Sequence, residues 1–206
     1  NDLRQVSLGR AQLAGYCSPK GRLLAVLTVQ QLAEDDFALL LPAGLAGPTL
    51  KRLRMFVLRS KLTVSDASST VASLGLIGSD AGEQLARLGL PAPAEPYAAH
   101  VGADHWLLRG PGPVPRFELR GSPAQVAVWQ ATLALPAVQP EHWALAAVLA
   151  GTPQVSEQTV DRFVPQTIDL DTAGGVSFTK GCYPGQEIVA RVHYLGRAKQ
   201  RLRLAR

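Results

Sequence analysis

Cys182 is one of only two cysteines in the 206 residues, and it stands in the segment KGCYPGQEIVAR, residues 180–191. Pro184 suits the first position of a helix, which makes Tyr183 the expected N-cap and places Cys182 directly ahead of the helix. A helix N-terminus and a nearby cation, here Lys180, both favour thiolate over thiol. The segment therefore predicts a reactive thiol at position 182. The alternative is a small buried residue in a tight turn, which is a common role for an unpaired cysteine.

The remaining cysteine and the histidines indicate no metal centre and no disulfide framework. Cys17 closes a predicted strand, where core packing is its expected role, and neither cysteine belongs to a CxxC motif. The four histidines show no metal-ligand spacing, so no metal is expected, although His193 could approach Cys182 in space as a base. A chain this poor in cysteine fits a reducing, cytoplasmic setting.

The charge balance favours anionic partners only weakly. The sequence holds 21 Lys and Arg against 16 Asp and Glu, a net charge of +5. The densest basic stretch is GRAKQRLRLAR, residues 196–206, in which leucines alternate with arginines. This pattern is typical of a strand with one apolar face, and few aromatic residues interleave with the charges, so direct nucleic-acid binding is not expected. No apolar run approaches the ~20 residues of a membrane span, so no membrane association is expected either.

The elements that must position the cysteine segment begin with three strands. The turn residues SPKG join the first two strands, and alternation predicts the three over 11–17, 22–29 and 36–41. A helical face follows, made of Leu50, Leu53, Phe56 and Val57. A short strand, KLTVSD, is expected after this helix.

From residue 69 the predicted order is strand, helix, three strands and helix, which fits a ferredoxin-like split β-α-β unit. Ser79 or Asp80 is the expected N-cap of the first helix, and Ser122 that of the second, with Pro123 at its first position. Another helix, PEHWALAAVLAG, and a short strand over 176–178 lead to the cysteine segment. The predicted fold class is α+β.

The cysteine segment resembles the K-G-C-[FY]-x-G-Q-E-x-x-[AS]-R signature of the YgfZ-type folate-binding protein family. These proteins are relatives of the glycine cleavage T-protein, an aminomethyltransferase, and include an iron–sulfur assembly branch. The stretches ND, YCSPKGRLLA, KRLRMFVLRSKLTV and FVPQTIDLDTAGGVSFTKGCY are similar to family segments and stand in family order. The resemblance covers nearly the whole chain.

The resemblance implies a glycine cleavage T-protein-like folate-binding fold. Residues 1–67 and 137–196 would form its discontinuous folate-binding domain, and residues 68–136 the ferredoxin-like α+β subdomain. Residues 197–206 would begin a C-terminal β-barrel that is truncated or absent here. A further segment would precede Asn1.

The resemblance also implies a function: tetrahydrofolate-dependent support of iron–sulfur cluster assembly or repair, which affects tRNA modification indirectly. The implied partners are folate and either iron–sulfur proteins or cluster-assembly factors. The conserved-type cysteine of the family falls on Cys182, the candidate catalytic residue. A folate-contacting tryptophan falls on Trp143, and a second one would precede Asn1. Trp129, in the middle of a helix, is expected in the core.

Folate would require a flat apolar wall, a few polar groups and cations for its anionic tail. Trp143 is the expected wall, and Gln166 is a candidate for the pterin edge. Lys180 and Arg191 are candidates for the glutamate tail. Arg191 has an alternative role, because Glu187 precedes it by four residues in the favourable order for a helix ion pair.

One departure from the T-protein bears on catalysis. The T-protein has a carboxylate in a G-x-I-D-D-type stretch of its second strand, where this chain has Leu24 and Ala25. No acid remains there to handle a proton at the pterin amine, which counts against glycine-cleavage chemistry but not against a folate site. Whether any folate-dependent one-carbon transfer is catalysed stays open. Two alternatives remain beside the folate-binding reading: a true aminomethyltransferase and a non-enzymatic interaction module.

Overall fold

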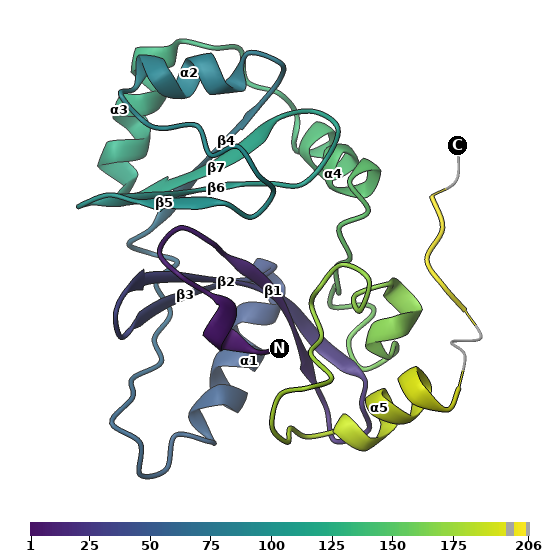
Figure 1. Cartoon of the computed structure of the whole chain (residues 1–206). Helices are drawn as coiled ribbons and strands as arrows, with labels where there is room; N and C mark the ends of the chain where they lie inside the picture. The colour runs from purple at the N-terminus through teal and green to yellow at the C-terminus, as the bar shows by residue number, and fades with distance from the viewer. Residues whose placement is uncertain (197–199, 205–206) are drawn as a thin grey trace.

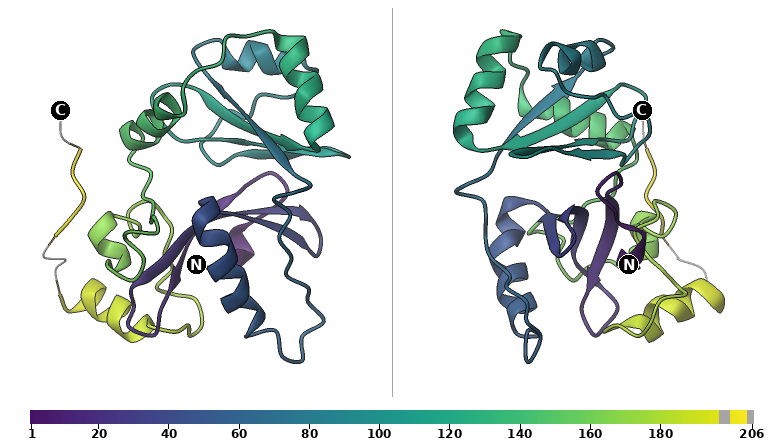
Figure 2. Two further views of the ribbon diagram at one scale, coloured as in Figure 1. Left: turned by 180° about the vertical axis from the view of Figure 1, so that it is seen from behind. Right: turned by 60° about the vertical axis from the view of Figure 1, so that its left-hand side comes forward.

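The computed structural model describes residues 1–196 and 200–204, which fold into two stacked antiparallel sheets with helices around them (Figure 1). The first sheet has the order β1-β2-β3 and consists of β1 (Gln12–Cys17), β2 (Leu23–Ala33) and β3 (Asp36–Leu40). The second has the order β4-β7-β6-β5 and consists of β4 (Ala72–Ile77), β5 (Ala99–Val101), β6 (His105–Arg109) and β7 (Arg116–Gly121). Figure 2 shows the same two layers from behind and from the side.

The first sheet shares its core with segments from both ends of the chain. Around it lie η1 (Leu3–Gln5), α1 (Ala43–Arg54), the short 3-10 helix η2 (Pro165–Ile168) and α5 (Gln186–Tyr194). Leu23, Ala25 and Leu170 are completely buried in this core. The cysteine segment is therefore attached to the first sheet.

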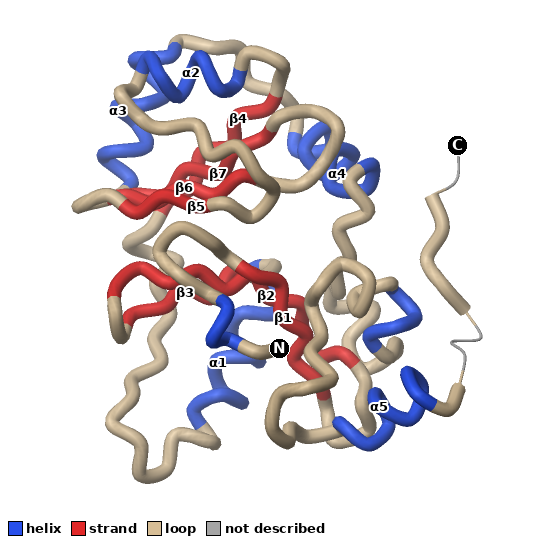
Figure 3. The backbone as a smooth tube through the Cα atoms, viewed as in Figure 1, coloured by secondary structure: helices blue, strands red, loops and turns tan. Residues whose placement is uncertain are grey.

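The second sheet has its own core, which it shares with α2 (Ala81–Arg87) and α3 (Pro123–Leu133). Its centre consists of Leu85, Leu107, Phe117 and Leu119, each at most 1% exposed. The fourth helix, α4 (Pro140–Leu149), follows α3 and leads back to the first sheet (Figure 3).

The strand order of the second sheet corrects the predicted ferredoxin-like unit. A split β-α-β connection joins two parallel strands with one strand between them. Here β4 and β5, which flank α2, run in opposite directions with β7 and β6 between them. The reason is that β5, β6 and β7 pair consecutively as a meander, and the chain after α3 continues into α4 instead of adding another strand.

Two predicted helix starts, those of α2 and α3, are found at the residues that the sequence predicted as N-caps. Ser122 caps α3 by accepting a hydrogen bond from the Gln125 amide at 3.2 Å, and Pro123 is the first helical residue. Asp80 is the N-cap of α2, although its side chain makes no cap hydrogen bond.

Other predicted elements are wrong. Residues 61–66 and 176–178 form no strand in the described chain. Helix α1 begins at Ala43 and ends at Arg54, so it lies earlier than the predicted face, and Phe56 is 59% exposed beyond its end. Residues 200–204 are neither helix nor strand, and the remainder of the predicted barrel start, 197–199 and 205–206, lies outside the described residues.

Hydrogen bonds join the segment before β1 to the region of β5, and β2 to β6. The Ala11 amide donates to the Tyr97 carbonyl at 2.9 Å, and the Ala99 amide to the Gly9 carbonyl at 2.9 Å. Gln30 Nε2 donates to the Leu107 carbonyl at 3.5 Å in a buried position. Tyr97 has a φ of 63°, which is unusual for a bulky residue, so the backbone at this junction is held in place by its surroundings. No helix among the described residues is long and apolar enough to cross a membrane.

Candidate functional site

The cysteine segment forms a loop that ends in α5, and the helix begins later than predicted. Its N-cap is Gly185, with a φ of 82°, and Gln186 is the first helical residue. The predicted N-cap, Tyr183, instead donates its amide to the Gln186 side-chain oxygen at 3.2 Å. The chain turns at Gly185 because glycine adopts positive φ at little energetic cost, so Pro184 stays in the loop.

Gly185 also fixes the loop against the turn between β1 and β2. A side-chain carbon added at Gly185 would lie 2.4 Å from the Ser18 carbonyl oxygen and 2.6 Å from the Gly21 nitrogen. One added at Gly21 would in turn lie 2.8 Å from Ile188 Cβ. The two glycines therefore permit a close approach between segments that are far apart in the sequence.

Cys182 is exposed in this loop, four positions before the first residue of α5. The field of a helix dipole falls off within the first turn, so α5 contributes less to thiolate formation than predicted. Lys180 is half-buried, and its Nζ lies 5.3 Å from the centre of the Tyr183 ring. The structure shows that the Cys182 thiol is accessible. The nearest cationic residue before it in the sequence is Lys180, two positions earlier.

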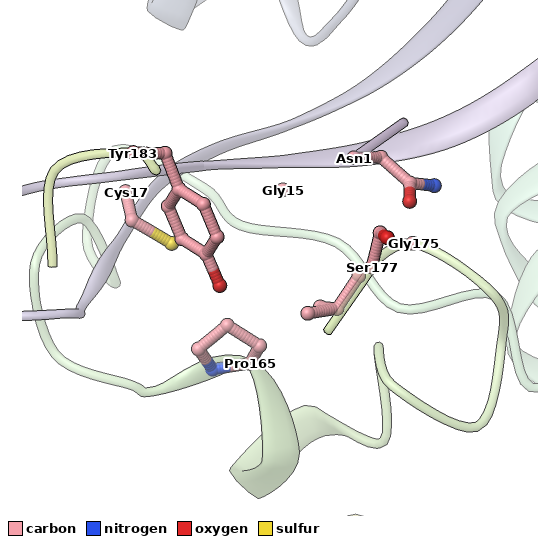
Figure 4. Close-up of a pocket in the computed structure, with 8 residues that line it drawn as sticks. Asn1, Gly15, Cys17, Pro165, Gly175, Ser177 and Tyr183 are labelled. Carbon is pink, nitrogen blue, oxygen red and sulfur yellow. The ribbon is translucent and has the colours of Figure 1, made fainter. Parts of the chain in front are cut away.

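Beneath the loop lies a small pocket of about 220 Å³, formed mainly by β1, η2 and the loop (Figure 4). Its lining residues are Asn1, Gly15, Cys17, Pro165, Gly175, Val176, Ser177 and Tyr183. Burial raises the pKa of Cys17 to about 11 and the pKa of Tyr183 to about 12, so both side chains are neutral at pH 7. The volume of about 220 Å³ includes open solvent, and the enclosed space is only about 10 Å³, room for about one water molecule, so this pocket is too small for a folate.

Gln166 and Arg191 have different surroundings from those predicted. Gln166 is 1% exposed, and its Nε2 donates to the Val189 carbonyl at 2.8 Å, so it connects η2 to α5. Arg191 is exposed on α5. It forms no ion pair with Glu187 among the interactions of the described chain. A role for either residue in folate contact stays a prediction.

Trp143 lies on the second sheet, away from the pocket residues. It is half-buried on α4, and a side-chain carbon at Gly75 in β4 would lie 3.0 Å from its ring. The Arg116 guanidinium carbon lies 5.3 Å from the centre of the same ring. The structure therefore does not gather the predicted site residues into one cavity: Lys180 and Cys182 belong to the loop, and Trp143 to the second sheet.

The sequence reasoning missed a row of charged residues on β7. Arg116, Glu118 and Arg120 alternate with Phe117 and Leu119, so they occupy the face of the sheet opposite α2 and α3. Both arginines are more than nine-tenths buried, and Arg120 is ion-paired with Glu118. The sequence predicted a short strand here, and the alternation RFELR shows its two faces, but nothing in the sequence indicated that the charged face is covered.

Several buried polar atoms in the layer between the sheets have no hydrogen-bond partner. They include Arg120 Nη1, Trp106 Nε1 and Gln30 Oε1. Burial lowers the pKa of the Arg116 guanidinium, although Glu118 and Tyr97 oppose this effect. Arg116 has other partners: its Nε donates to the Pro111 carbonyl at 2.9 Å and its Nη2 to the Thr152 hydroxyl at 3.3 Å. Such a layer is suited to an anionic or polar ligand, because uncompensated buried polar groups are otherwise costly.

No group of three or more His, Cys, Asp or Glu side chains in the described part of the chain could hold a metal ion. The candidate functional regions are separate. One is the exposed thiol loop with the small pocket beneath it, and the other is the polar face of the second sheet, next to Trp143.

Comparison with solved structures identifies the class of fold. The chain is similar to the glycine cleavage system aminomethyltransferase T of Bartonella henselae, with a TM-score of 0.73, 16% identity, and coverage of 95% of this chain and 56% of that one. This is an α+β protein of the T-protein fold. At this identity the likeness concerns the fold alone. No family model matches the chain.

Sequence relatives give the family. The chain is 32% identical over 209 residues to the tRNA-modifying protein YgfZ of Edwardsiella ictaluri and 29% identical over 203 residues to those of Colwellia psychrerythraea and Escherichia coli. These matches include 98% of the chain, which spans about three-fifths of the length of the relatives. The chain belongs to the YgfZ family, as the signature around Cys182 predicted.

Proposed function

We propose that the chain binds reduced folate and supports iron–sulfur cluster assembly or repair, with an indirect effect on tRNA modification. The relatives are named tRNA-modifying proteins, and the fold is similar to that of a glycine cleavage system aminomethyltransferase T. The partners proposed are iron–sulfur proteins or assembly factors, and the proposed setting is the reducing cytoplasm, which suits two free cysteines.

The polar layer at Trp143 is the observation that best supports folate binding. Folate combines a flat ring that has donors and acceptors with an anionic tail. The layer offers a half-buried indole, a partnerless guanidinium nitrogen on Arg120 and a partnerless amide oxygen on Gln30. These groups fit the ligand, because stacking needs an exposed ring face and carboxylates are bound best by guanidinium groups.

Each residue has a proposed task. Trp143 would stack on the ring, and Arg116 and Arg120 would neutralise carboxylates. Lys180 and Arg191 stay candidates for the glutamate tail, although they lie on the thiol loop and α5 and not beside Trp143. Gln166 would act by holding η2 against α5. When bound, reduced folate supplies a one-carbon carrier. The protein would contribute binding and exclusion of water between its sheets.

Cys182 is the proposed reactive group. Its thiol is exposed, and the residue directly follows Gly181 and stands two residues after Lys180. Such a thiol could accept sulfur, a one-carbon unit or iron. One cysteine cannot hold a cluster alone. Alkylation with iodoacetamide at pH 7 to 9 tests this role, with Cys17 as the internal control, because burial and a pKa of about 11 make Cys17 unreactive. If Cys182 reacts no faster than a free thiol, and Cys182→Ser fully complements a deletion strain, the reactive role is wrong.

We also propose the domain division expected from the sequence, with 68–136 separate from 1–67 and 137–196. The two cores support it, since one draws on residues 6–45 and 155–170 and the other on residues 76–133. Helix α4 would be the bridge, because Trp143 reaches from the later segment onto β4.

Aminomethyl transfer is the second candidate activity, and β2 counts against it. No acidic residue occurs in Leu23–Ala33, and Ala25 is fully buried where the T-protein has a carboxylate. A glycine-cleavage assay decides this point. Isothermal calorimetry with tetrahydrofolate tests the main proposal, and absence of binding would favour a non-enzymatic interaction module.

A further inference from the structure

We propose that the loop following α1 is a docking site for a protein partner that presents acidic side chains beside an apolar groove. The site includes the last turn of α1, residues 51–54, and the loop after it, residues 55–64, and the whole stretch 51–64 is called the basic–apolar loop below. It leaves the body of the molecule beneath the first sheet and returns toward β4 (Figures 1 and 2). The inference goes beyond folate binding and does not depend on it.

The loop exposes an unusual amount of apolar surface. Met55 is 66% exposed, Phe56 59%, Leu58 85% and Leu62 57%. Isolated exposed apolar residues need no explanation, but four within eight positions concentrate apolar surface in one short segment. Burial of these side chains against a partner would be favourable.

The same loop concentrates positive charge. Its cations are Lys51, Arg52, Arg54, Arg59 and Lys61, and no acidic residue occurs from residue 37 to residue 65. Five uncompensated cations equal the formal net charge of the whole chain. Within residues 1–196 and 200–204, no ion pair involves these five side chains. The charge therefore remains available to an acidic partner.

Hydrogen bonds hold the loop in a defined shape. Arg54 Nε donates to the Val64 carbonyl at 2.8 Å and closes the base of the loop. The Leu62 amide donates to the Ser60 carbonyl at 2.8 Å near its turn. The turn thus falls midway between Arg54 and Val64, close to Arg59. A fixed backbone with side chains already exposed can bind with little ordering entropy.

The position of the cations favours a protein over a membrane. Arg59 and Lys61 stand between Leu58 and Leu62 at the turn, so insertion of the leucines into lipid would carry two cations into hydrocarbon. RNA fits less well, because three of the four exposed side chains are aliphatic and cannot stack on bases as aromatic residues do. An apolar groove rimmed by carboxylates satisfies both the leucines and the cations.

The test uses a fluorescein-labelled peptide of alternating Leu and Glu, with a Leu–Lys peptide and a Ser–Glu peptide as controls. Fluorescence anisotropy should show binding of the Leu–Glu peptide only, weaker at high salt because the charge contribution is screened. Equal binding of all three peptides, or no binding of the Leu–Glu peptide at up to about 1 mM, would overturn the proposal.

Two double variants divide the contributions. Leu58→Ser/Leu62→Ser and Arg59→Glu/Lys61→Glu should each weaken binding about tenfold or more, as expected for central contacts. The matched controls are Leu145→Ser, 54% exposed on α4, and Arg162→Glu, exposed outside the loop. Thermal melts should show that all four variants stay folded. Unchanged binding in both loop variants contradicts the proposal.

Three competing occupants are measured with the same variants. Vesicles containing phosphatidylserine report a membrane, a single-stranded RNA reports nucleic acid, and sedimentation of the chain alone reports self-association. Suppose that the loop variants abolish binding to vesicles, to RNA or to a second copy of the chain, but leave binding of the Leu–Glu peptide unchanged. The loop then serves that occupant, and the acidic partner is rejected.

Discussion

The two faces of the second sheet differ sharply, although they are built by the same strands. On the side of α2 and α3, Phe117 and Leu119 of β7 are at most 1% exposed within an apolar core. On the other side, the intervening Arg116, Glu118 and Arg120 lie in the layer toward the first sheet and α4. One six-residue strand thus supplies a sealed core and a buried polar layer.

This difference separates stability from binding. The helix-side face gains free energy from apolar burial, which needs no ligand. The opposite face has partnerless atoms on Arg120 and Trp106, and it has a half-buried tryptophan, Trp143. Such buried polar groups need a partner, which ordered water or a bound ligand can supply. Substitutions on the two faces should therefore affect different measurements.

The largest effect is expected for Trp129→Ala on the helix-side face. Trp129 is 4% exposed and packs against Gly121, where an added side-chain carbon would lie 3.2 Å from its ring. Its removal leaves a cavity and should lower the free energy of unfolding by about 3–5 kcal/mol. Urea denaturation followed by circular dichroism measures this. A loss below about 1 kcal/mol would show that this core repacks.

A smaller loss of stability, together with a loss of folate binding, is expected for Arg120→Met. The substitution leaves Glu118 without its cation, and Glu118 is only partly exposed, so the expected cost is about 1–3 kcal/mol. The double variant Glu118→Leu/Arg120→Met should regain most of that stability but not the calorimetric binding of tetrahydrofolate. Restored binding in the double variant would remove Arg120 from the proposed site.

Trp143→Ala should change stability by only about 1 kcal/mol, because the indole is half-buried on one side of the sheet. Calorimetric binding of tetrahydrofolate should nevertheless fall about tenfold or more, since the ring wall is lost. Trp143→Phe keeps a flat ring and is the matched control that should retain most binding. Equal binding by the alanine variant would make Trp143 a packing residue.

The smallest effect at neutral pH is expected for Tyr97→Phe at the junction between the sheets. Burial raises the pKa of Tyr97 to about 12, whereas in the unfolded chain its hydroxyl ionises near about 10. The folded state therefore loses stability as pH rises from about 10 to 12, and is unaffected below that window. The free energy of unfolding of the variant, measured by urea denaturation, should equal that of the parent at pH 7. Between pH 7 and pH 11 it should fall less than that of the parent. An identical loss at pH 11 would assign the base sensitivity to other groups, including Tyr183, whose pKa is also raised to about 12.

How much the sequence predicted depends on how local each feature is. The start of α3 was predicted from Ser122 and Pro123 alone, because an N-cap is decided by neighbouring residues. The start of α5 was wrong, because Pro184 is equally compatible with a loop and the contact that fixes Gly185 comes from Ser18. The family was predicted from one continuous signature, which required no knowledge of tertiary contacts.

The candidate site was less predictable, since its parts meet only through packing. Gln166 looked like a free polar group beside Pro165, but the fold uses it to bind the Val189 carbonyl. Arg116 and Arg120 belong to a predicted short strand whose faces the sequence did not assign, and their burial follows only from the tertiary structure. A pattern of alternation shows that a strand has two faces, but it does not show what covers each one.

The contact between Gly185 and the β1–β2 turn has a consequence for biosynthesis. The turn leaves the ribosome more than 160 residues before its partner, on the order of 10 s or more at ordinary rates of translation. The Asn1 side chain likewise donates to the Gly174 carbonyl at 2.7 Å, across 173 residues. Meanwhile the second sheet and its two helices, all within residues 72–133, can complete their own core. Strands β1 to β3 must therefore wait with apolar surface uncovered while a later unit folds, so the nascent first sheet is exposed to aggregation for longer than the second.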